Sequence, residues 1–250
     1  MGTISVVIPC RNDAPFLAVC LDALRGQSRR PDEVIVVDDG STDDSAAIAR
    51  GAGARVVAQP HRGIWPATAA GFDEATGEIL ARLDADSVPA PDWLERVEQR
   101  MGSDDRPTAV TGVGTFYGGT RPWRWIARHL YLGGYFTVIG AVLGHPPLFG
   151  SNSALRRDAW SVLRALVHRD RADVHDDLDL SWWMQPGMTV VYDPSLVVGV
   201  SIRPFESPEE LGRRLVMAFR TLAVDWRAWP ARRRRAERRR AMDAAGAVTR

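Results

Sequence analysis

Two carboxylates separated by a single residue follow a short apolar segment, and this spacing suits metal or ligand binding. Residues 79–83 predict a buried strand, which Pro89 and Pro91 prevent from continuing. We therefore expect Asp84 and Asp86 at the carboxyl end of that strand, where open α/β sheets bind ligands. Mg²⁺ or Mn²⁺ bound together with substrate phosphates fits such a pair, whereas a solvated turn or a helix cap is the alternative.

A second pair of acids follows another apolar strand. Residues 34–37 are apolar throughout, which indicates burial on both faces, and Asp38 and Asp39 come directly after them. A helix cap explains Ser41, but it does not explain paired acids before Gly40. We expect Asp38 and Asp39 at the same edge of the sheet as the first pair.

Strand and helix patterns alternate along most of the chain. This alternation predicts an α/β fold in which a mostly parallel, Rossmann-like sheet is flanked by helices and joined by right-handed crossovers. A C-terminal helical extension is expected after residue 205. Strands are predicted at residues 4–8, 34–37, 55–58, 79–83, 108–114 and 196–200.

The composition is typical of a globular protein, since 45% of the 250 residues are hydrophobic and 25% are charged. Cys10 and Cys20 are expected as small core residues, so neither a disulfide framework nor a zinc site is supported. No signal peptide is expected before the first strand, which predicts a cytoplasmic protein. All 32 basic residues are arginine, so no lysine serves in catalysis.

The C-terminal end is strongly basic. Nine arginines and two acids from Arg227 onward give it a charge of +7, which leaves −6 on the rest of a chain of net charge +1. Residues 232–240 are expected in solvent, and two interpretations stay open: peripheral contact with an anionic membrane at its inner face, aided by Trp226 and Trp229, or a disordered end. The preceding helix is expected to pack on the body through Leu211, Leu215, Val216, Phe219 and Leu222.

The segment from Leu130 to Leu155 contains no Asp, Glu or Arg. A membrane span needs about 20 apolar residues, and Pro146 and Pro147 interrupt this run, so we do not expect a transmembrane helix. A buried helix beneath the functional site is the favoured interpretation. A surface that enters the bilayer interface is the alternative.

Three segments together resemble a family 2 glycosyltransferase of the GT-A fold. They are Ser5–Asn12, Val34–Asp43 and Leu83–Ser87, in this order and spacing. The likeness covers roughly residues 3–205 and implies a GT-A domain at 1–205, with a nucleotide-sugar half at 1–115 and an acceptor half at 116–205. Residues 206–250 then form C-terminal helices with the Arg-rich tail.

The resemblance implies a role for each matching residue. On the donor side, Asp84 lies near the ribose and Asp86 binds the divalent cation, Mg or Mn, on the diphosphate. The other nucleotide-binding residues that it implies are Pro9, Asn12, Asp38 and Asp39, with Pro9 and Asp39 at the base, normally uridine.

Further matches concern the acceptor side. The resemblance makes Asp177 the catalytic base and places Asp176, Gly150 and Asn152 beside the acceptor. An acid-rich helix N-terminus is the alternative explanation for residues 175–181, above all for Asp176 and Asp179, because the helix dipole favours negative charge there.

The sequence departs from the family pattern at three places. Thr68 and Ala69 stand where relatives often have Arg and Asn, which bears on the base preference, and Ser201 stands near the position of a metal-binding His. The Gln-x-x-Arg-Trp motif of processive relatives is absent, which favours a single transfer per acceptor.

The expected function is therefore an inverting, non-processive, metal-assisted transfer of sugar to an acceptor hydroxyl. The partners are a nucleotide sugar, with UDP favoured, and a glycan or lipid-linked acceptor; no nucleic acid is expected. A sugar nucleotidyltransferase is the first alternative, but residues 9–13 lack its Gly-rich basic loop. A non-catalytic module that binds anionic membrane through the Arg tail is the second.

Overall fold

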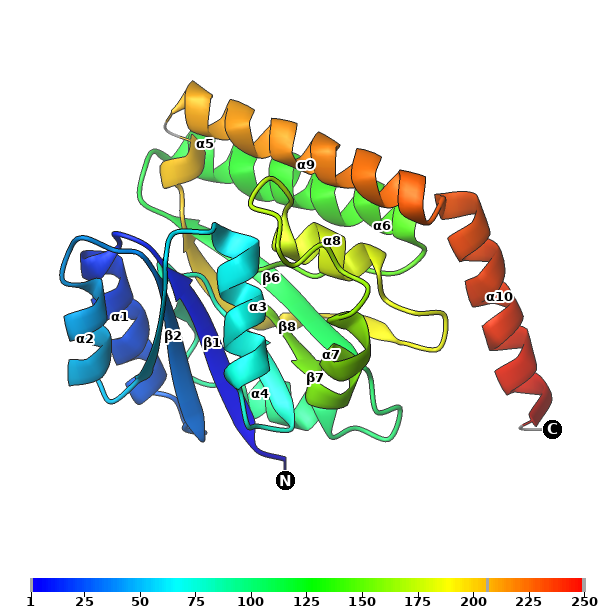
Figure 1. The fold of residues 1–250 in the computed structure, drawn as a ribbon, viewed down its shortest axis with the longest axis horizontal. Helices are drawn as coiled ribbons and strands as arrows, with labels where there is room; N and C mark the ends of the chain where they lie inside the picture. The colour runs from blue at the N-terminus through cyan, green and yellow to red at the C-terminus, as the bar shows by residue number, and fades with distance from the viewer. Residues whose placement is uncertain (1, 206, 249–250) are drawn as a thin grey trace.

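A computed structural model describes residues 2–205 and 207–248 of the chain. One sheet of eight strands, in the order β3-β2-β1-β4-β7-β6-β8-β5, forms its centre, with helices on both faces (Figure 1). The strands are β1 (Ile4–Cys10), β2 (Glu33–Asp39), β3 (Arg55–Gln59), β4 (Ile79–Arg82), β5 (Val88–Pro89), β6 (Ala109–Tyr117), β7 (Ser153–Arg156) and β8 (Val190–Ser201).

Two apolar layers hold the helices to the sheet. The first contains α1, α2 and α4, and the second contains α3, α7 and α8. Cys10 and Cys20 are free thiols in the first layer, as predicted. The helices are α1 (Ala14–Arg25), α2 (Ser45–Gly51), α3 (Ile64–Glu74), α4 (Trp93–Met101), α7 (Arg157–Leu163) and α8 (Asp176–Trp182).

The mostly parallel sheet predicted from the alternating patterns is confirmed. The four strands from β3 to β4 are parallel, and so are β6 and β8. Strand β7 runs antiparallel to both β4 and β6, and β5 runs antiparallel to β8. No strand was predicted from the sequence where β7 lies, because four residues are too few to show a strand period.

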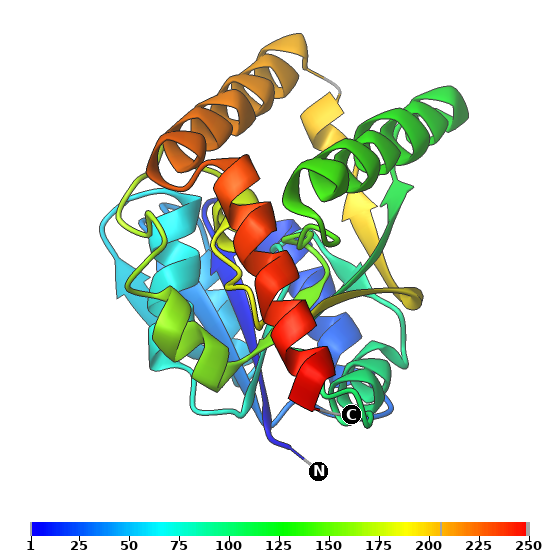
Figure 2. The same ribbon diagram turned by 90° about the vertical axis from the view of Figure 1, so that its right-hand side faces the viewer.

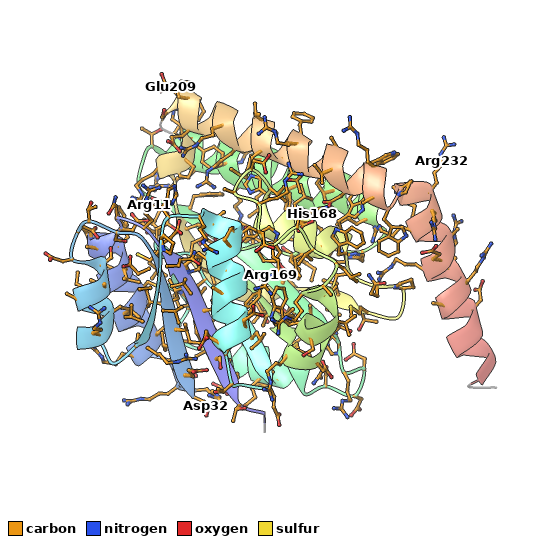
Figure 3. All side chains as sticks on the ribbon, viewed as in Figure 1. Arg11, Asp32, His168, Arg169, Glu209 and Arg232 are labelled. Carbon is orange, nitrogen blue, oxygen red and sulfur yellow. The ribbon has the colours of Figure 1, made fainter. Side chains whose placement is uncertain are left out.

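The edge of the sheet that carries the acids is formed as predicted. Strand β1 includes Pro9, which is paired with Val37, and β2 includes Asp38 and Asp39. In Figure 3, Arg11 after β1 marks this carboxyl edge, and Asp32 before β2 marks the opposite edge. The loops after β1, β2 and β4 therefore meet on one side of the molecule.

The expectation that the apolar segment after β6 is a buried helix is wrong. Residues Arg121–Leu143 form a continuous helix, made of α5 (Arg121–Ile126), two π-helical segments, Ala127–Leu132 and Tyr135–Ile139, and α6 (Gly140–Leu143). By length and composition this helix could cross a membrane, and only 17% of its most apolar window is buried in the protein. The helix starts nine residues before Leu130, so it is largely complete before the two prolines.

The C-terminal helices also differ from the prediction. Of the apolar residues predicted to pack on the body, Leu222 does so, but helix α9 (Pro208–Ala228) turns Leu215, Val216 and Phe219 to solvent. The helix buries Thr221 and Asp225 instead. Polar contacts explain this orientation: His175 N donates to Thr221 Oγ1 at 2.9 Å, and Trp183 Nε1 donates to Asp225 Oδ1 at 3.2 Å.

The basic tail is helical and partly buried, so the prediction of a fully solvated tail is wrong. Helix α10 (Ala231–Val248) buries Arg234 completely between the Trp182 and Trp229 rings, and Arg234 donates to Leu143 O. Arg238 donates to Met188 O at 2.9 Å. Figure 2 shows α10 running down from α9 across one side of the domain.

Candidate active site

Arg82, at the end of β4, connects the donor and acceptor halves of the candidate site. Its Nη1 lies 2.7 Å from Asp84 Oδ1, and its Nη2 lies 2.8 Å from Asp176 Oδ2. Only 3% of the Arg82 side chain is exposed, so this cation is matched by two carboxylates in a dry environment. Burial alone raises the pKa of Asp84, but the charges of Arg82 and Arg214 and a hydrogen bond from Ser151 hold it below its usual value.

Asp177, the residue matched to the catalytic base, adjoins this network at the start of α8. Gly150 N donates to Asp177 Oδ2 at 3.1 Å. Burial and the neighbouring charge of Asp176 raise the pKa of Asp177, which suits a proton acceptor. A Cβ at Gly150 would lie 2.3 Å from Arg82 Nη1, so only glycine permits this close approach.

Asp86 lies beside a second arginine that the sequence did not single out. Arg203, two residues after β8, places Nη1 2.8 Å from Asp13 Oδ1 and Nη2 3.2 Å from Asp86 Oδ2. Its guanidinium also lies 3.7 Å from the centre of the Phe16 ring. Burial and the nearby Asp84 charge raise the pKa of Asp86 to about 6, against the opposite effect of Arg203.

Ser201, near the expected position of a metal-binding His, is buried and accepts a hydrogen bond from Arg203 N at 3.3 Å. Because its hydroxyl is directed at the backbone of Arg203, Ser201 helps to place the arginine. A cationic side chain thus lies beside Asp86, near the place where the resemblance led us to expect a metal-binding His.

Asp39 organises the loop that follows β3. Its buried carboxylate accepts hydrogen bonds from Arg62 N at 2.8 Å and Gly63 N at 3.0 Å, and it contacts His61 Nδ1 at 2.7 Å. The loop of residues 60–63 therefore lies over the end of β2. A nucleotide base placed beside Asp39 would meet this loop as well.

The remaining nucleotide-side residues form a connected edge. Asn12 Oδ1 accepts from Thr42 N at 2.7 Å, and Asp38 Oδ1 accepts from Ser41 N at 3.1 Å. Asn12 has a φ of 50°, a left-handed conformation that asparagine tolerates better than most residues. The loop after β1 is thereby fixed to the loop after β2, with Pro9 beneath it in the strand.

Asn152 lies deeper than predicted. It is fully buried: its Oδ1 accepts from Trp93 Nε1 at 2.8 Å, and its Nδ2 donates to Val113 O and Leu196 O. All polar groups of this side chain are engaged inside the protein, so Asn152 has none left to bind an acceptor directly. Its hydrogen bonds instead join α4, β6 and β8 behind Gly150.

Thr68 belongs to the acceptor side of the site. Its hydroxyl donates to Asp176 Oδ2 at 2.8 Å, which gives this carboxylate two partners, Thr68 and Arg82. Asp176 is therefore held as a buried structural anion beside Asp177. Sequence reasoning missed Arg82, although a lone arginine within a buried strand signals a carboxylate partner.

Two groups of ligand atoms lie close enough for a metal among residues 2–205 and 207–248. They are His168 with Asp179 and Asp225, and His175 with Asp176 and Asp177. Asp86 is in neither group, and in the described part of the chain only its Oδ2 has a partner. One free carboxylate oxygen, completed by phosphates and water, is a donor set that Mg²⁺ and Mn²⁺ accept, so Asp86 fits a nucleotide-bound cation.

The fold is that of the GT-A glycosyltransferases. Glucosyl-3-phosphoglycerate synthase from Mycobacterium tuberculosis, solved with Mn²⁺, UDP-glucose and phosphoglyceric acid, matches with a TM-score of 0.65 and 24% identity over 90% of this chain and 80% of that one. A mannosyltransferase from Pyrobaculum calidifontis, solved with GDP-mannose and Mn²⁺, matches with a TM-score of 0.60 and 20% identity over 99% of this chain and 80% of that one.

The chain belongs to glycosyl transferase family 2, whose sequence model matches residues 5–163. An uncharacterized glycosyltransferase from Mycobacterium tuberculosis is 39% identical over 127 residues, which are 50% of this chain and 54% of that protein. A glycosyltransferase from Haloferax volcanii is 36% identical over 101 residues, 37% of this chain and 33% of that protein. The chain thus spans about half the length of the first of these relatives.

Proposed function

We propose that this protein transfers one sugar from a nucleoside-diphosphate sugar to an acceptor hydroxyl, with inversion at the anomeric carbon. The observation that carries the proposal is the Arg82 network. The Arg82 guanidinium contacts Asp84, on the donor side, and lies against Gly150. Gly150 in turn donates its backbone N–H to Asp177, the residue matched to the base. A donor and an acceptor bound on either side of this network would meet beside Asp177, and such positioning lowers the barrier of a bimolecular transfer.

Each side chain has a defined part in this mechanism. Asp39 and the loop it holds take the base, Asp84 takes the ribose, and Asp177 accepts the proton of the attacking hydroxyl. The new bond forms at the anomeric carbon as the bond to the diphosphate breaks, and the diphosphate leaves on the opposite face. Asp86 would hold a divalent cation, Mg or Mn, which neutralises charge on the leaving diphosphate when bound.

Arg203 adds positive charge beside the same diphosphate position. It lies next to Asp86 and Asp13, so it can turn toward phosphate oxygens once a cation takes its place on Asp86. UDP is the favoured donor nucleotide on the family resemblance, and the solved relatives bind UDP-glucose or GDP-mannose. A glycan or a lipid-linked sugar is the proposed acceptor, and the proposed location is the cytoplasm.

A sugar nucleotidyltransferase has less support. That reaction usually needs a flexible, basic, Gly-rich loop for pyrophosphate, whereas the loop after β1 is fixed by Asn12 to the backbone of Thr42. A non-catalytic role built on a free basic tail also has less support, because α10 packs on the body through Arg234.

Two measurements test the proposal. Thermal unfolding with a panel of nucleoside diphosphates, with and without Mn²⁺, should show stabilisation by UDP that increases with the cation. Proton NMR of the product made from an α-linked donor should then show a β-linkage. Stabilisation by no nucleoside diphosphate would contradict the function, and retention of the α-configuration would contradict the mechanism alone.

A further inference from the structure

Two helices carry most of the large apolar side chains that the protein exposes. Eight of the twelve exposed large apolar residues among the described residues lie on the Arg121–Leu143 helix and on α9. Exposed apolar side chains that gather on one part of a protein usually mark an interaction surface, whereas single ones scattered over the surface are common. The residues are Trp123, Trp125, Leu130, Val138, Leu215, Val216, Phe219 and Trp226.

The two helices lie on the same side of the domain. They run along the top of the molecule in Figure 1, and in Figure 2 they are two neighbouring helices above the sheet. On α9, the positions of Leu215, Phe219 and Trp226 fall on one side of an ideal helix, and Figure 3 shows side chains of α9 projecting away from the body. We call these eight exposed side chains and the arginines around them the helix-pair face.

Positive charge surrounds the apolar residues of this face. The Arg121–Leu143 helix contains Arg121, Arg124 and Arg128 and no acid. Helix α9 contributes four arginines against Glu209 and Glu210 in its first turn, and its third acid, Asp225, is fully buried. Exposed tryptophans beside arginines suit the boundary between lipid headgroups and acyl chains.

The helix-pair face lies at the carboxyl edge of the sheet, near the candidate site. The positive charge of Arg214, on α9, acts to lower the pKa of Asp84, which belongs to the candidate site. It acts in the same way on Tyr131, which lies on the Arg121–Leu143 helix. A surface docked against this face would therefore lie on the same side of the domain as the candidate site.

We propose that the helix-pair face binds the headgroup region of an anionic lipid bilayer, with both helices parallel to the membrane plane. Charge decides between this occupant and a second copy of the chain, because two copies would bring like charges together. A spanning helix is disfavoured because Ala127, Leu132 and Leu143 of this helix are buried in the domain. The proposal does not depend on which sugar or nucleotide the enzyme uses.

Vesicle co-sedimentation of the full chain tests the proposal. Vesicles of phosphatidylcholine with about 30% phosphatidylglycerol should bind the protein, and high salt or pure phosphatidylcholine should weaken binding by about tenfold or more. Alkaline carbonate should release the bound protein. Absence of binding at low salt, or resistance to carbonate extraction, would overturn the interfacial docking.

Matched variants locate the binding surface. The triple variant Trp123→Ser/Trp125→Ser/Phe219→Ser should lose about tenfold or more in vesicle affinity, whereas Val19→Ser/Val162→Ser, at exposed apolar sites on α1 and α7, should lose less than about twofold. Phe219→Asp alone, at a side chain that is 71% exposed, provides a second variant that leaves the fold intact. Equal losses in the triple variant and the valine control would overturn the assignment.

Charge variants separate this face from the tail. The triple variant Arg121→Gln/Arg124→Gln/Arg128→Gln should reduce binding to anionic vesicles. The control variant Arg25→Gln/Arg30→Gln/Arg50→Gln should not. If glutamine at the exposed tail arginines Arg232, Arg239 and Arg240 abolishes binding and the first set does not, the tail is the membrane contact instead. A dimer in solution that Phe219→Asp dissociates would show a second copy as the occupant.

Discussion

Arg82 Nη2 lies 2.8 Å from Asp176 Oδ2, inside the protein and between the two halves of the candidate site. The same guanidinium contacts Asp84, so one buried cation balances a donor-side carboxylate and the carboxylate next to the candidate base. Removing one charge from a buried pair leaves the other uncompensated, which costs more than the pair contributes. The relationship therefore predicts effects on both stability and catalysis.

Arg82→Met should lower the free energy of unfolding by about 3–5 kcal/mol, because buried Asp176 and half-buried Asp84 are left without a cation. The double variant Arg82→Met/Asp176→Asn should recover part of the loss, since one of the two charges is gone. Denaturant unfolding measures both. Arg25→Met, which breaks an exposed pair with Asp22, is the control and should cost no more than about 1 kcal/mol. Equal costs at Arg82 and Arg25 would contradict the buried network.

Asp39→Ala should weaken binding of UDP by about tenfold, with or without a divalent cation, because the contact to the base and the position of residues 60–63 do not need the metal. Calorimetry in EDTA and in Mn²⁺ measures this. Asp44→Ala, at an exposed acid whose side chain makes no cap hydrogen bond, is the matched control. Unchanged affinity in Asp39→Ala would remove this residue from the donor site.

Asp86→Asn should abolish the tightening of diphosphate binding by Mn²⁺, since an amide is a poorer ligand for a hard cation. Arg203→Gln should weaken metal-free diphosphate binding and keep the Mn²⁺ effect. Titration of each variant with UDP separates the two roles. Persistence of the Mn²⁺ effect in Asp86→Asn would place the cation elsewhere, with His175, Asp176 and Asp177 as the next set of ligands.

The contact between α8 and α9 should make stability depend on pH. Burial, the Asp179 charge and a hydrogen bond with Asp179 raise the pKa of Asp225 to about 10 from 3.8. The native state then binds one more proton than the unfolded state between these values, so stability falls as pH rises from about 4 to about 10. Figure 3 shows His168, which contacts both aspartates, beneath α9.

Asp225→Asn removes this titration, so the melting temperature of the variant relative to the wild type should increase steadily from pH 5 to pH 9. Thermal unfolding in matched buffers measures the difference. Asp243→Asn, at an exposed acid of α10, is the control and should show no such trend. A pH-independent difference for Asp225→Asn would show that Asp225 is charged in the native state.

The sequence predicted the α/β fold and the placement of the acids well, because both depend on local signals. Unbroken apolar strands and the residues that end them located Asp38, Asp39, Asp84 and Asp86 at one edge. Arg82 and Arg203 escaped prediction, since their partners are as much as 190 residues away along the chain. Long-range ion pairs leave no periodic pattern.

Helix amphipathicity misled the prediction for α9. Its apolar stripe predicted packing on the body, but buried hydrogen bonds from His175 and Trp183 orient the opposite side of the helix inward. The basic composition of α10 likewise led to a wrong prediction, because it indicated that the whole tail lies in solvent. Burial of Arg234 depends on the Trp182 and Trp229 rings and on the carbonyl of Leu143, which only the tertiary structure brings together.

The most direct test of the account is the rate of sugar transfer by Asp177→Asn beside Asp176→Asn. Asp177→Asn should lower kcat by about 10²–10⁴-fold and leave donor affinity near the wild-type value, because it removes a proton acceptor and keeps the shape of the side chain. Asp176→Asn should cost less, since Asp176 positions its neighbours through Arg82 and Thr68. Equal losses, or a larger loss at Asp176, would contradict the assignment of Asp177 as the catalytic base.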